Sequence, residues 1–453
     1  MQKHNGIHFY INIINFNAII SEEECKTQKV THAIHAMDTF FTSIENFGKK
    51  HYPKTFVVEK ITGSRLHLYV TDALNDAFEA VKCISAYAYQ LARSINKDIS
   101  KYKTLKDFYI NVGVAYGKFY EFEFTTNNGF SETTTIGYAA NYAAKLQALS
   151  QCGKISISED VYDALPLEEK EVFEVVHNVS IKKYGQDKYY TSHLINLKSP
   201  VTITDEDMTI AINYANSDNL GDIEFAEVRS TLKFSELSKT QCKKLEGIPV
   251  FADVRGFTSQ FMDDDSNLEE MAQRTQDILT SMYKVSTEHG GIHVQFQGDR
   301  ELSLYHNIPG QIVDGVSQVE QTCFKSAVLA SMRMVDAVKA YTVHIGVGED
   351  FGRVFATKIG ARGEKDNILI GETIIQADIM EDRNAAEDQI AITKKVFEGL
   401  REEDEYLASQ FSQKGDYYIS TIGYHQYSRN LSYKQQRNNT SNNNYNGAWG
   451  NQL

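Results

Sequence analysis

The stretch Phe251-Ala252-Asp253-Val254-Arg255-Gly256-Phe257 decides both the fold and the chemistry that this sequence predicts. It closes an apolar run that starts near Gly247, which indicates a buried strand ending in a carboxylate and a glycine turn. Farther along the chain, Gly298-Asp299 lies between two runs of apolar and β-branched residues, the pattern of a β-hairpin. The sequence therefore places one aspartate at the end of a strand and a second in a hairpin turn.

The same series of features occurs a first time near the start of the chain. The run Tyr10–Phe16 has the same cadence as the quoted stretch. Gly63 and Gly298 are 235 residues apart, and Gly137 and Gly371 are 234 apart. Pairs that recur in one order at a nearly constant offset indicate a duplicated domain, because chance matches between strand-turn patterns would not keep their spacing.

Each copy reads as strand, helix, hairpin, helix and strand, with the second helices expected at residues 73–95 and 316–338. This order is the split βαβ arrangement, an antiparallel sheet with helices on one face. We therefore predict an α+β fold class with two tandem ferredoxin-like βαββαβ domains. The expected divisions are a first domain at 1–198, a connector at 199–245, a second domain at 246–427 and an Asn-rich tail, disordered by its composition, at 428–453.

The two aspartates of the second copy indicate a metal site. The first strand and the hairpin are neighbours in this arrangement, so their ends can bring Asp253 and Asp299 together. Two adjacent carboxylates repel each other unless a cation lies between them. Pairs of divalent cations held by aspartates and substrate phosphate oxygens serve phosphoryl transfer. Each aspartate alone is also a common turn residue, so the pair carries the prediction.

These residues resemble the class III nucleotidyl cyclases. The family motif F-x-D-[IV]-x-G-F matches residues 251–257 in full, Phe257 included, and the family hairpin G-D matches Gly298-Asp299. The resemblance implies that Asp253 and Asp299, with the backbone carbonyl of Val254, bind two divalent cations, Mg²⁺ or Mn²⁺. It also implies that Phe257 lies on the substrate side. The family's Gly-x-Val strand, whose basic residue holds the triphosphate, matches the stretch around Arg353 after a two-residue insertion.

In this family two domains share each site, and one of them supplies the metal ligands. The resemblance therefore implies an intramolecular pseudo-heterodimer of the two copies. The first copy has neutral Asn12 and Ser64 at the metal positions, which cannot replace two carboxylates on paired divalent ions. The second copy has lost the complementary set, because Gln295, Ile375 and Ile379 stand at the base-reading, Asn and Arg positions. One competent site per chain and one degenerate pocket are expected.

The first copy keeps the complementary set. Lys60 and Thr134 match the two base-reading positions of the family, and Asn141 matches its transition-state Asn. Lys145 stands where the family has Arg, which keeps the charge but loses the bidentate fork. Near the position of the family's triphosphate lysine are Lys182 and Lys183.

The resemblance leaves the base open. A Lys with a Thr suits the adenine edge, whereas guanylyl enzymes carry Glu and Cys. Arg65 and Arg300 follow the hairpin turns, where the family has small residues, and a bulky Arg suits a smaller pyrimidine. As a whole, the chain is similar to the Pycsar-type pyrimidine cyclases of bacterial antiphage defence, in particular their tandem cytidylate cyclases. That similarity implies conversion of CTP to cyclic CMP for a separate cyclic-nucleotide-gated effector, with UTP and ATP as alternative substrates.

Other classes of protein stay open beside a cyclase. A non-catalytic nucleotide sensor would not need both aspartates, and an interaction scaffold would leave the complementary losses unexplained. Diguanylate cyclases share the βαββαβ core, but the chain contains no GG[DE]EF stretch.

Composition limits the partners. The 453 residues include 46 Lys and Arg against 60 Asp and Glu, a net charge of −14, which does not favour nucleic acid or anionic membranes by bulk charge. The apolar runs are far shorter than the roughly 20 residues needed to cross a bilayer. Five scattered cysteines without a CxxC pair predict a cytoplasmic location. The expected partner is a nucleoside triphosphate, and homodimer formation stays open.

Overall fold

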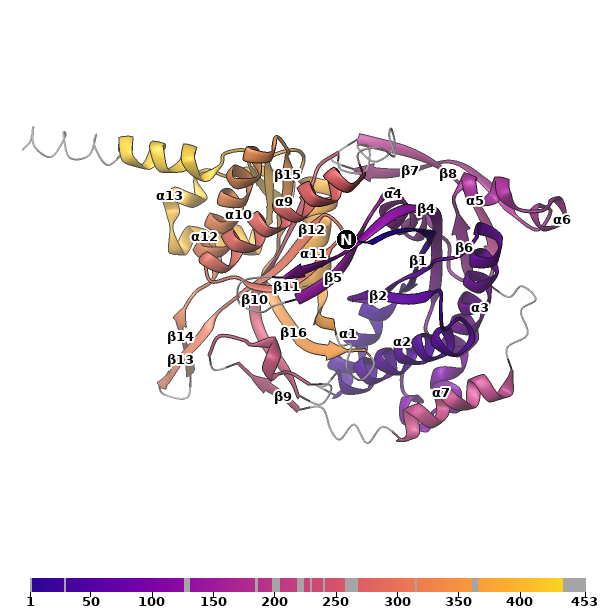
Figure 1. Ribbon diagram of the computed structural model, residues 1–453. Helices are drawn as coiled ribbons and strands as arrows, with labels where there is room; N and C mark the ends of the chain where they lie inside the picture. Colours follow the sequence, from indigo (N-terminus) through magenta and orange to yellow (C-terminus); the bar gives the residue numbers. More distant parts are fainter. Residues whose placement is uncertain are drawn as a thin grey trace, which may run out of the picture.

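The computed structural model describes residues 2–27, 30–125, 131–183, 186–197, 204–217, 224–228, 230–238, 241–256, 268–313, 316–360 and 366–434. In these residues the chain forms two copies of one α+β unit, which lie side by side (Figure 1). The first copy is indigo to magenta and the second is salmon to yellow in the figure.

The two copies have the same sheet topology. The first sheet has the order β2-β3-β1-β4-β6-β8-β7, with β5 paired to β4. Its strands are β1 (Gln2–Ile13), β2 (Phe56–Thr62), β3 (Arg65–Val70), β4 (Ile110–Thr125), β5 (Ser131–Ile136), β6 (Lys154–Ile157), β7 (Glu174–Lys183) and β8 (Gln186–Asn196). The second sheet has the equivalent order β11-β12-β10-β15-β18-β20-β19, with β16 and β17 in the places of the outer part of β4 and of β5. The predicted duplication and the α+β class are confirmed.

The strands of the second copy differ from those of the first mainly by one interruption. They are β10 (Gln241–Val254), β11 (Ile292–Gln297), β12 (Arg300–His306), β15 (Ile345–Glu349), β16 (Gly352–Ile359), β17 (Asp366–Ile370), β18 (Gln389–Thr393), β19 (Ser412–Lys414) and β20 (Tyr417–Ser420), with β9 (Glu224–Glu227) added beside β10. Asp350 and Phe351 separate β15 from β16, whereas β4 runs unbroken. These two residues are the insertion noted in the sequence.

Helices cover both faces of each sheet, so the expectation of helices on one face is wrong. The helices are α1 (Phe16–Thr27), α2 (Thr31–His51), α3 (Leu74–Asp98), α4 (Tyr138–Leu149), α5 (Glu159–Ala164), α6 (Leu167–Lys170), α7 (Asp205–Ser217), α9 (Leu268–Glu288), α10 (Phe324–Val338), α11 (Glu372–Ile379), the π-helical turn η5 (Met380–Asn384), α12 (Lys394–Glu403) and α13 (Glu405–Ala408). Helices α2 and α3 pack on the face of the first sheet that carries Phe9 and Val114. Helix α4 packs on the opposite face, against Ala115.

A glycine under each inner helix sets how closely it approaches the sheet. A Cβ at Gly113 of β4 would lie 2.0 Å from the backbone N of Gln147 in α4. A Cβ at Gly348 of β15 would lie 2.1 Å from the backbone N of Glu381, at the end of α11. These glycines are 235 residues apart and so are equivalent in the two copies. They fix α4 and α11 on the faces where the copies meet.

Each copy extends an arm into the core of the other. Phe122 and Phe124 of β4 belong to the apolar core of the second copy, and the Phe124 ring lies 4.5 Å from that of Phe296. In the other direction, Phe355 and Ile368 belong to the core of the first copy. The two copies therefore form a pseudo-heterodimer within one chain.

The helix expected at 316–338 is shorter than predicted. Its first third forms β14 (Val316–Gln321), which pairs with β13 (Ile308–Val313) in a separate hairpin. Helix α10 begins at Phe324, where the Asn307 side chain accepts the N–H of Cys323 at 3.1 Å. A short apolar segment fits both periods, and here pairing with β13 decided the outcome.

Two further expectations concern the connector and the tail. Within 199–245, α7 contacts α2, and Asp207 accepts a 2.8 Å hydrogen bond from Lys50. The chain is helical from 424 to 434, and Tyr427 is buried in the second core, so disorder is wrong for the first residues of the tail. Residues 435–453 lie outside the described part of the chain. Among the described helices, none combines the length and apolarity that a bilayer crossing requires.

A buried carboxyl in β15 makes the stability of the fold depend on pH. Burial raises the pKa of Glu349 from 4.5 to about 7, and Ser331 donates a 2.6 Å hydrogen bond to it. The folded protein therefore keeps a proton that the unfolded chain loses above pH 4.5, so the contribution of Glu349 to the free energy of unfolding falls as pH rises towards 7. A Glu349→Gln variant, which cannot ionise, should gain about 3 kcal/mol over the parent above this range relative to below it. Urea unfolding at both pH values measures this difference, and parallel pH profiles would contradict the assignment.

Candidate active site

The predicted metal ligands lie at one edge of the second sheet. Strand β10 pairs with β12 with Asp253 opposite Arg300, so Asp253 and Asp299 are close neighbours across the two strands. Gly298 makes the tight turn with a φ of 68°, a backbone conformation that favours glycine. Val254 ends β10 directly after Asp253. The structure therefore brings the three predicted metal-binding residues together.

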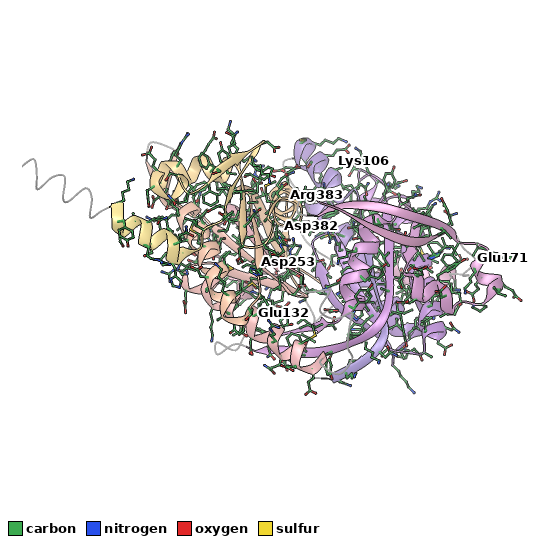
Figure 2. The ribbon with its side chains drawn as sticks, turned by 90° about the horizontal axis from the view of Figure 1, so that it is seen from above. Lys106, Glu132, Glu171, Asp253, Asp382 and Arg383 are labelled. Atoms are coloured by element: carbon green, nitrogen blue, oxygen red, sulfur yellow. The ribbon has the colours of Figure 1, made fainter. Side chains whose placement is uncertain are left out.

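This donor set fits hard divalent cations. Mg²⁺ and Mn²⁺ prefer carboxylate and carbonyl oxygens, which Asp253, Asp299 and Val254 can supply. The Asp299 side chain is largely buried and the Asp253 carboxylate is 18% exposed, so a bound cation would be partly shielded from water. Figure 2 shows Asp253 in the middle of the molecule, where the two copies meet.

Helix α4 of the first copy reaches this edge. A Cβ at Gly298 would lie 3.2 Å from Oδ1 of Asn141, so the Asn141 amide lies against the turn that carries Asp299. Lys145 is one helical turn farther on and so lies on the same side of α4. The predicted Asn and Lys of one copy therefore meet the predicted metal ligands of the other.

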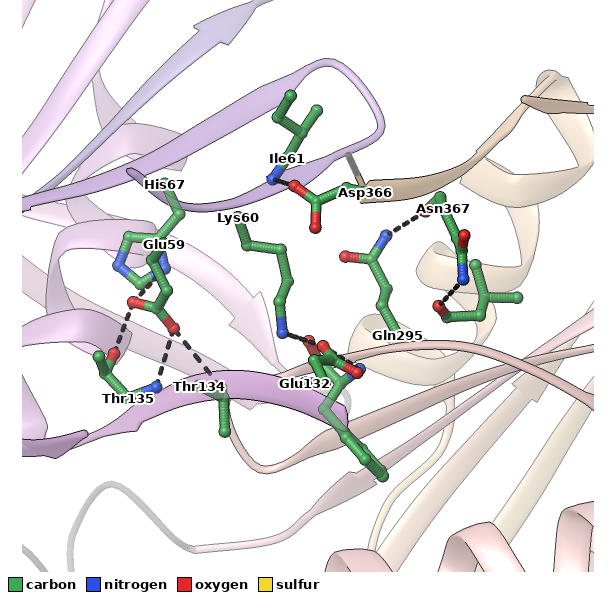
Figure 3. A network of polar contacts seen from close by, with 12 residues as sticks. Glu59, Lys60, Ile61, His67, Glu132, Thr134, Thr135, Gln295, Asp366 and Asn367 are labelled. Carbon is green, nitrogen blue, oxygen red and sulfur yellow. Dashed lines mark hydrogen bonds and ion pairs between the residues drawn. The ribbon is translucent and has the colours of Figure 1, made fainter. Parts of the chain in front are cut away.

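Lys60 also crosses between the copies (Figure 3). Its side chain is 3% exposed, pairs with the Glu132 carboxylate and donates a 2.5 Å hydrogen bond to the carbonyl of Phe296, which is three residues before Asp299. Glu132 also accepts the N–H of Phe296 at 3.0 Å. Burial would raise the pKa of Glu132, but the charges of Lys60 and His293 outweigh it and hold the pKa below its usual value. Lys60 is therefore a fixed, buried cation beside the aspartate turn.

Thr134 is held near Lys60 by Glu59. The Thr134 hydroxyl lies 3.5 Å from the Glu59 carboxylate, which also accepts the N–H of Thr135 at 3.0 Å and its hydroxyl at 2.5 Å. His67 lies 3.0 Å from Glu59 and 2.9 Å from His8. Burial would raise the pKa of Glu59, but His67 and the neighbouring groups lower it to about 2. This chain of buried hydrogen bonds fixes strand β5 beside Lys60.

Arg255 anchors Asp253 from within the motif. Its side chain is 1% exposed and donates to the Asp253 carboxylate at 2.9 Å and to the carbonyls of Glu381 and Ala385 at 2.8 and 2.7 Å. It also pairs with the Glu381 carboxylate, whose pKa burial raises to about 7. Gly346 makes room for this side chain, because a Cβ there would lie 1.7 Å from the guanidinium. Arg255 is therefore positioned to orient Asp253.

The ion pairs continue from Glu381 towards the other side of the interface. Arg300 pairs with Glu381 and, at 2.6 Å, with Asp378. Burial would raise the pKa of Asp378, but Arg300 and then Arg65 hold it below its usual value. Arg65 lies 3.9 Å from the other oxygen of Asp378. The sequence pattern missed Arg255, Glu381 and Glu132, because their partners are far away in the chain.

Some predicted site residues lie elsewhere. Arg353 stands opposite Glu246 in the β10–β16 register, seven residues and so roughly 23 Å from Asp253 along the strand, and it pairs with Glu24 of α1. Arg65 lines a separate pocket on the other side of the interface. The structure therefore does not bring Arg353 or Arg65 to the two aspartates.

Three other predicted residues are placed only in part. Lys182 and Lys183 end strand β7, whose backbone contacts η5 of the second copy. Their side chains and Phe257 lie outside the described part of the structure.

Comparison with known proteins agrees with this arrangement. Residues 2–196 match the family described as the adenylate and guanylate cyclase catalytic domain. A protein of Pseudomonas aeruginosa named uridylate cyclase is 23% identical over 264 residues, which cover 55% of this chain and 50% of that protein. A uridylate cyclase of a Rhizobium species is 20% identical over 80% of this chain and 72% of its own length. The match thus spans half the length of the Pseudomonas relative.

The fold of the whole chain also has a solved counterpart. The crystal structure of a class III adenylyl cyclase-like ATP-binding protein from Pseudomonas aeruginosa superposes with a TM-score of 0.67 at 15% identity, covering 95% of this chain and 90% of that one. At this identity the likeness concerns the fold alone. Both tandem copies are therefore part of a known arrangement.

Proposed function

Because residues 2–196 belong to the class III adenylate and guanylate cyclase catalytic domains, we propose that the chain is a nucleotidyl cyclase acting on a pyrimidine nucleoside triphosphate. The observation that carries the proposal is the contact between the two copies at Gly298. There the metal-type aspartates Asp253 and Asp299 of the second copy meet Asn141 of the first. Neither copy has both halves, so the pseudo-heterodimer forms one complete site.

The proposed reaction joins the ribose 3′-oxygen to the α-phosphorus. The bond between the α-phosphorus and the bridging oxygen breaks, pyrophosphate leaves and the 3′-hydroxyl loses its proton. Asp253, Asp299 and the Val254 carbonyl would hold two divalent cations. When bound, such ions lower the pKa of the hydroxyl and offset phosphate charge.

The other residues of the site bind and orient the substrate. Asn141 would hold the ribose against the aspartate turn, and Lys145 would offset the charge that develops on the α-phosphate. Arg255 keeps Asp253 in place through its 2.9 Å hydrogen bond. Lys182 and Lys183 are proposed to face the β- and γ-phosphates, because β7 reaches η5 of the second copy. Arg353 has no part in this proposal, since it pairs with Glu24.

Base recognition is proposed for Lys60 and Thr134. Two hydrogen-bonding directions of the Lys60 ammonium are used by Glu132 and Phe296, which leaves one for a base oxygen or ring nitrogen. The resemblance to tandem cytidylate cyclases favours CTP, whereas the names of the two curated relatives favour UTP. A role in antiphage defence through a cyclic-nucleotide-gated effector, and a cytoplasmic location, follow from the same resemblance and belong to the proposal.

Turnover of the four common nucleoside triphosphates tests the function. The purified full chain with Mn²⁺ should form a 3′,5′-cyclic nucleotide and pyrophosphate from CTP or UTP at least about tenfold faster than from ATP or GTP, the discrimination that one pocket supplies. Chromatography of the products and a pyrophosphate assay measure both. Cyclic UMP alone would replace the CTP preference with UTP, and a purine product alone would overturn the pyrimidine proposal. No cyclic product with any nucleotide would favour the non-catalytic sensor.

A further inference from the structure

A second pocket lies at the position equivalent to the proposed active site. Its lining includes the turn Gly63-Ser64 of the first copy and Gln295 and Ile375 of the second. These residues are the counterparts, 234 or 235 residues away, of Gly298-Asp299, Lys60 and Asn141. The pocket is therefore the mate of the active site under the pseudo-twofold relation between the copies.

This pocket cannot hold the metal ions of the active site. Ser64 donates a 2.9 Å hydrogen bond to Asn12, so the two side chains at the metal positions satisfy each other. Both are neutral, and Ile375 has no polar atom to orient a ribose. A triphosphate there would have no divalent ions to offset its charge.

One buried polar atom at the pocket has no partner. Gln295 is 3% exposed and donates from Nε2 to the carbonyl of Asn367 at 3.2 Å, but its Oε1 makes no hydrogen bond among the described residues. An unpaired buried amide oxygen is costly, and a ligand that donates an N–H would remove this cost. The free acceptor of Gln295 replaces the donor that Lys60 offers in the active site.

The size and charge of the pocket limit the ligand. Its volume is ≈ 100 Å³. A cavity of about 150 Å³ admits benzene, so the volume suits one six-membered ring better than a bicyclic purine. Apolar faces come from Phe16 and Ile374, and Arg65, whose side chain is 40% exposed, lies at the rim. At 3.9 Å from Asp378, Arg65 is close enough to pair loosely and to turn towards a single phosphate.

We propose that this pocket is a non-catalytic site for a pyrimidine nucleoside monophosphate. The base donates an N–H to Oε1 of Gln295, and the phosphate pairs with Arg65. The site would bind without turnover, because it has neither metal ligands nor the Asn and Lys of the active site. The inference depends on the geometry of the pocket and goes beyond the proposed activity.

Calorimetric titration of the full chain with CMP in EDTA tests the site. EDTA removes divalent ions, so binding does not depend on the catalytic metals. We expect one saturable site, with CMP bound more tightly than AMP or cytidine. Gln295→Leu should weaken CMP about tenfold, and Arg65→Ala should remove the advantage of CMP over cytidine. Competition with 3′,5′-cyclic CMP distinguishes a 5′-monophosphate from a cyclic ligand.

The matched control is Asn141→Ala, which alters the equivalent position of the active site. Its affinity for CMP should equal that of the parent chain. Unchanged CMP affinity in Gln295→Leu, equal loss in Asn141→Ala, or no saturable binding would overturn the proposal. If Gln295→Leu fails to fold by circular dichroism, the CMP and cytidine affinities of Arg65→Ala decide. Because the readout is binding without metal, a failed activity assay would leave this result independent.

Discussion

Asp253→Ala and Asp299→Ala are each expected to lower the rate of cyclic nucleotide formation by about a thousandfold, because each removes a metal ligand worth several kcal/mol in the transition state. The two carboxylates come from adjacent strands, with Asp253 directly opposite Arg300, so neither has a substitute nearby. Initial rates of pyrophosphate release with Mn²⁺ and the preferred pyrimidine nucleotide measure the effect. The fold should survive, since both residues lie at the end of a strand or in a turn rather than in an apolar core.

The first copy supplies the control for this pair of variants. Asn12 stands where the second copy has Asp253, and its partner is Ser64. Asn12→Ala should therefore keep cyclase activity within a few-fold of the parent chain, although it makes the equivalent change in the equivalent strand. Full activity in Asp299→Ala would falsify the two-carboxylate site. Equal loss in Asn12→Ala would mean that the strand change acts through folding.

Arg255→Ala is expected to lower the free energy of unfolding by about 3 kcal/mol or more, because it leaves buried carboxylates without their partner. Its guanidinium is 1% exposed and donates to Asp253, Glu381 and Ala385. Glu381 keeps Arg300, which places the loss near the lower end of the range for a broken buried pair. Urea unfolding followed by circular dichroism measures this change, and activity should fall as well, since Asp253 loses its anchor.

Arg353→Ala is the matched control, since it removes an arginine–glutamate pair at the surface. The Arg353 side chain is 52% exposed and pairs with Glu24 of the first copy. Exposed pairs contribute only about 0–1 kcal/mol, because solvent screens the charges and side-chain entropy opposes the contact. Similar losses in the two variants would show that burial does not determine the effect. A large loss of turnover in Arg353→Ala at full stability would restore Arg353 to the active site.

The repeated motifs predicted most of the fold. Two copies with one topology follow from the offsets of Gly63 and Gly298, because strands and tight turns need particular residue types at fixed spacing. The close packing of α4 at Gly113 follows no such local pattern. It depends on which helix the rest of the chain brings to that face of the sheet.

Individual site residues were predicted where the motif defines them in the backbone. Asp253 and Asp299 are close because the strand and the hairpin that carry them pair directly. Arg353 was expected beside them by a match of three residues, but the insertion at Asp350 and Phe351 breaks the strand before it. Its register then places it opposite Glu246. A pattern along the chain does not report such a shift, because register depends on hydrogen bonds to another strand.

The sequence alone determined that this chain holds two unequal copies, with carboxylates in one and Lys60, Asn141 and Lys145 in the other. Residue type and spacing carry that information directly. Only the tertiary structure decided how the halves meet: Asn141 lies against the turn of Asp299, Lys60 is buried with Glu132, and Gln295 has an unpaired oxygen in the pocket of the neutral pair. The reason is physical. These contacts join residues far apart in sequence, and their strength comes from burial between two copies, which no local pattern contains.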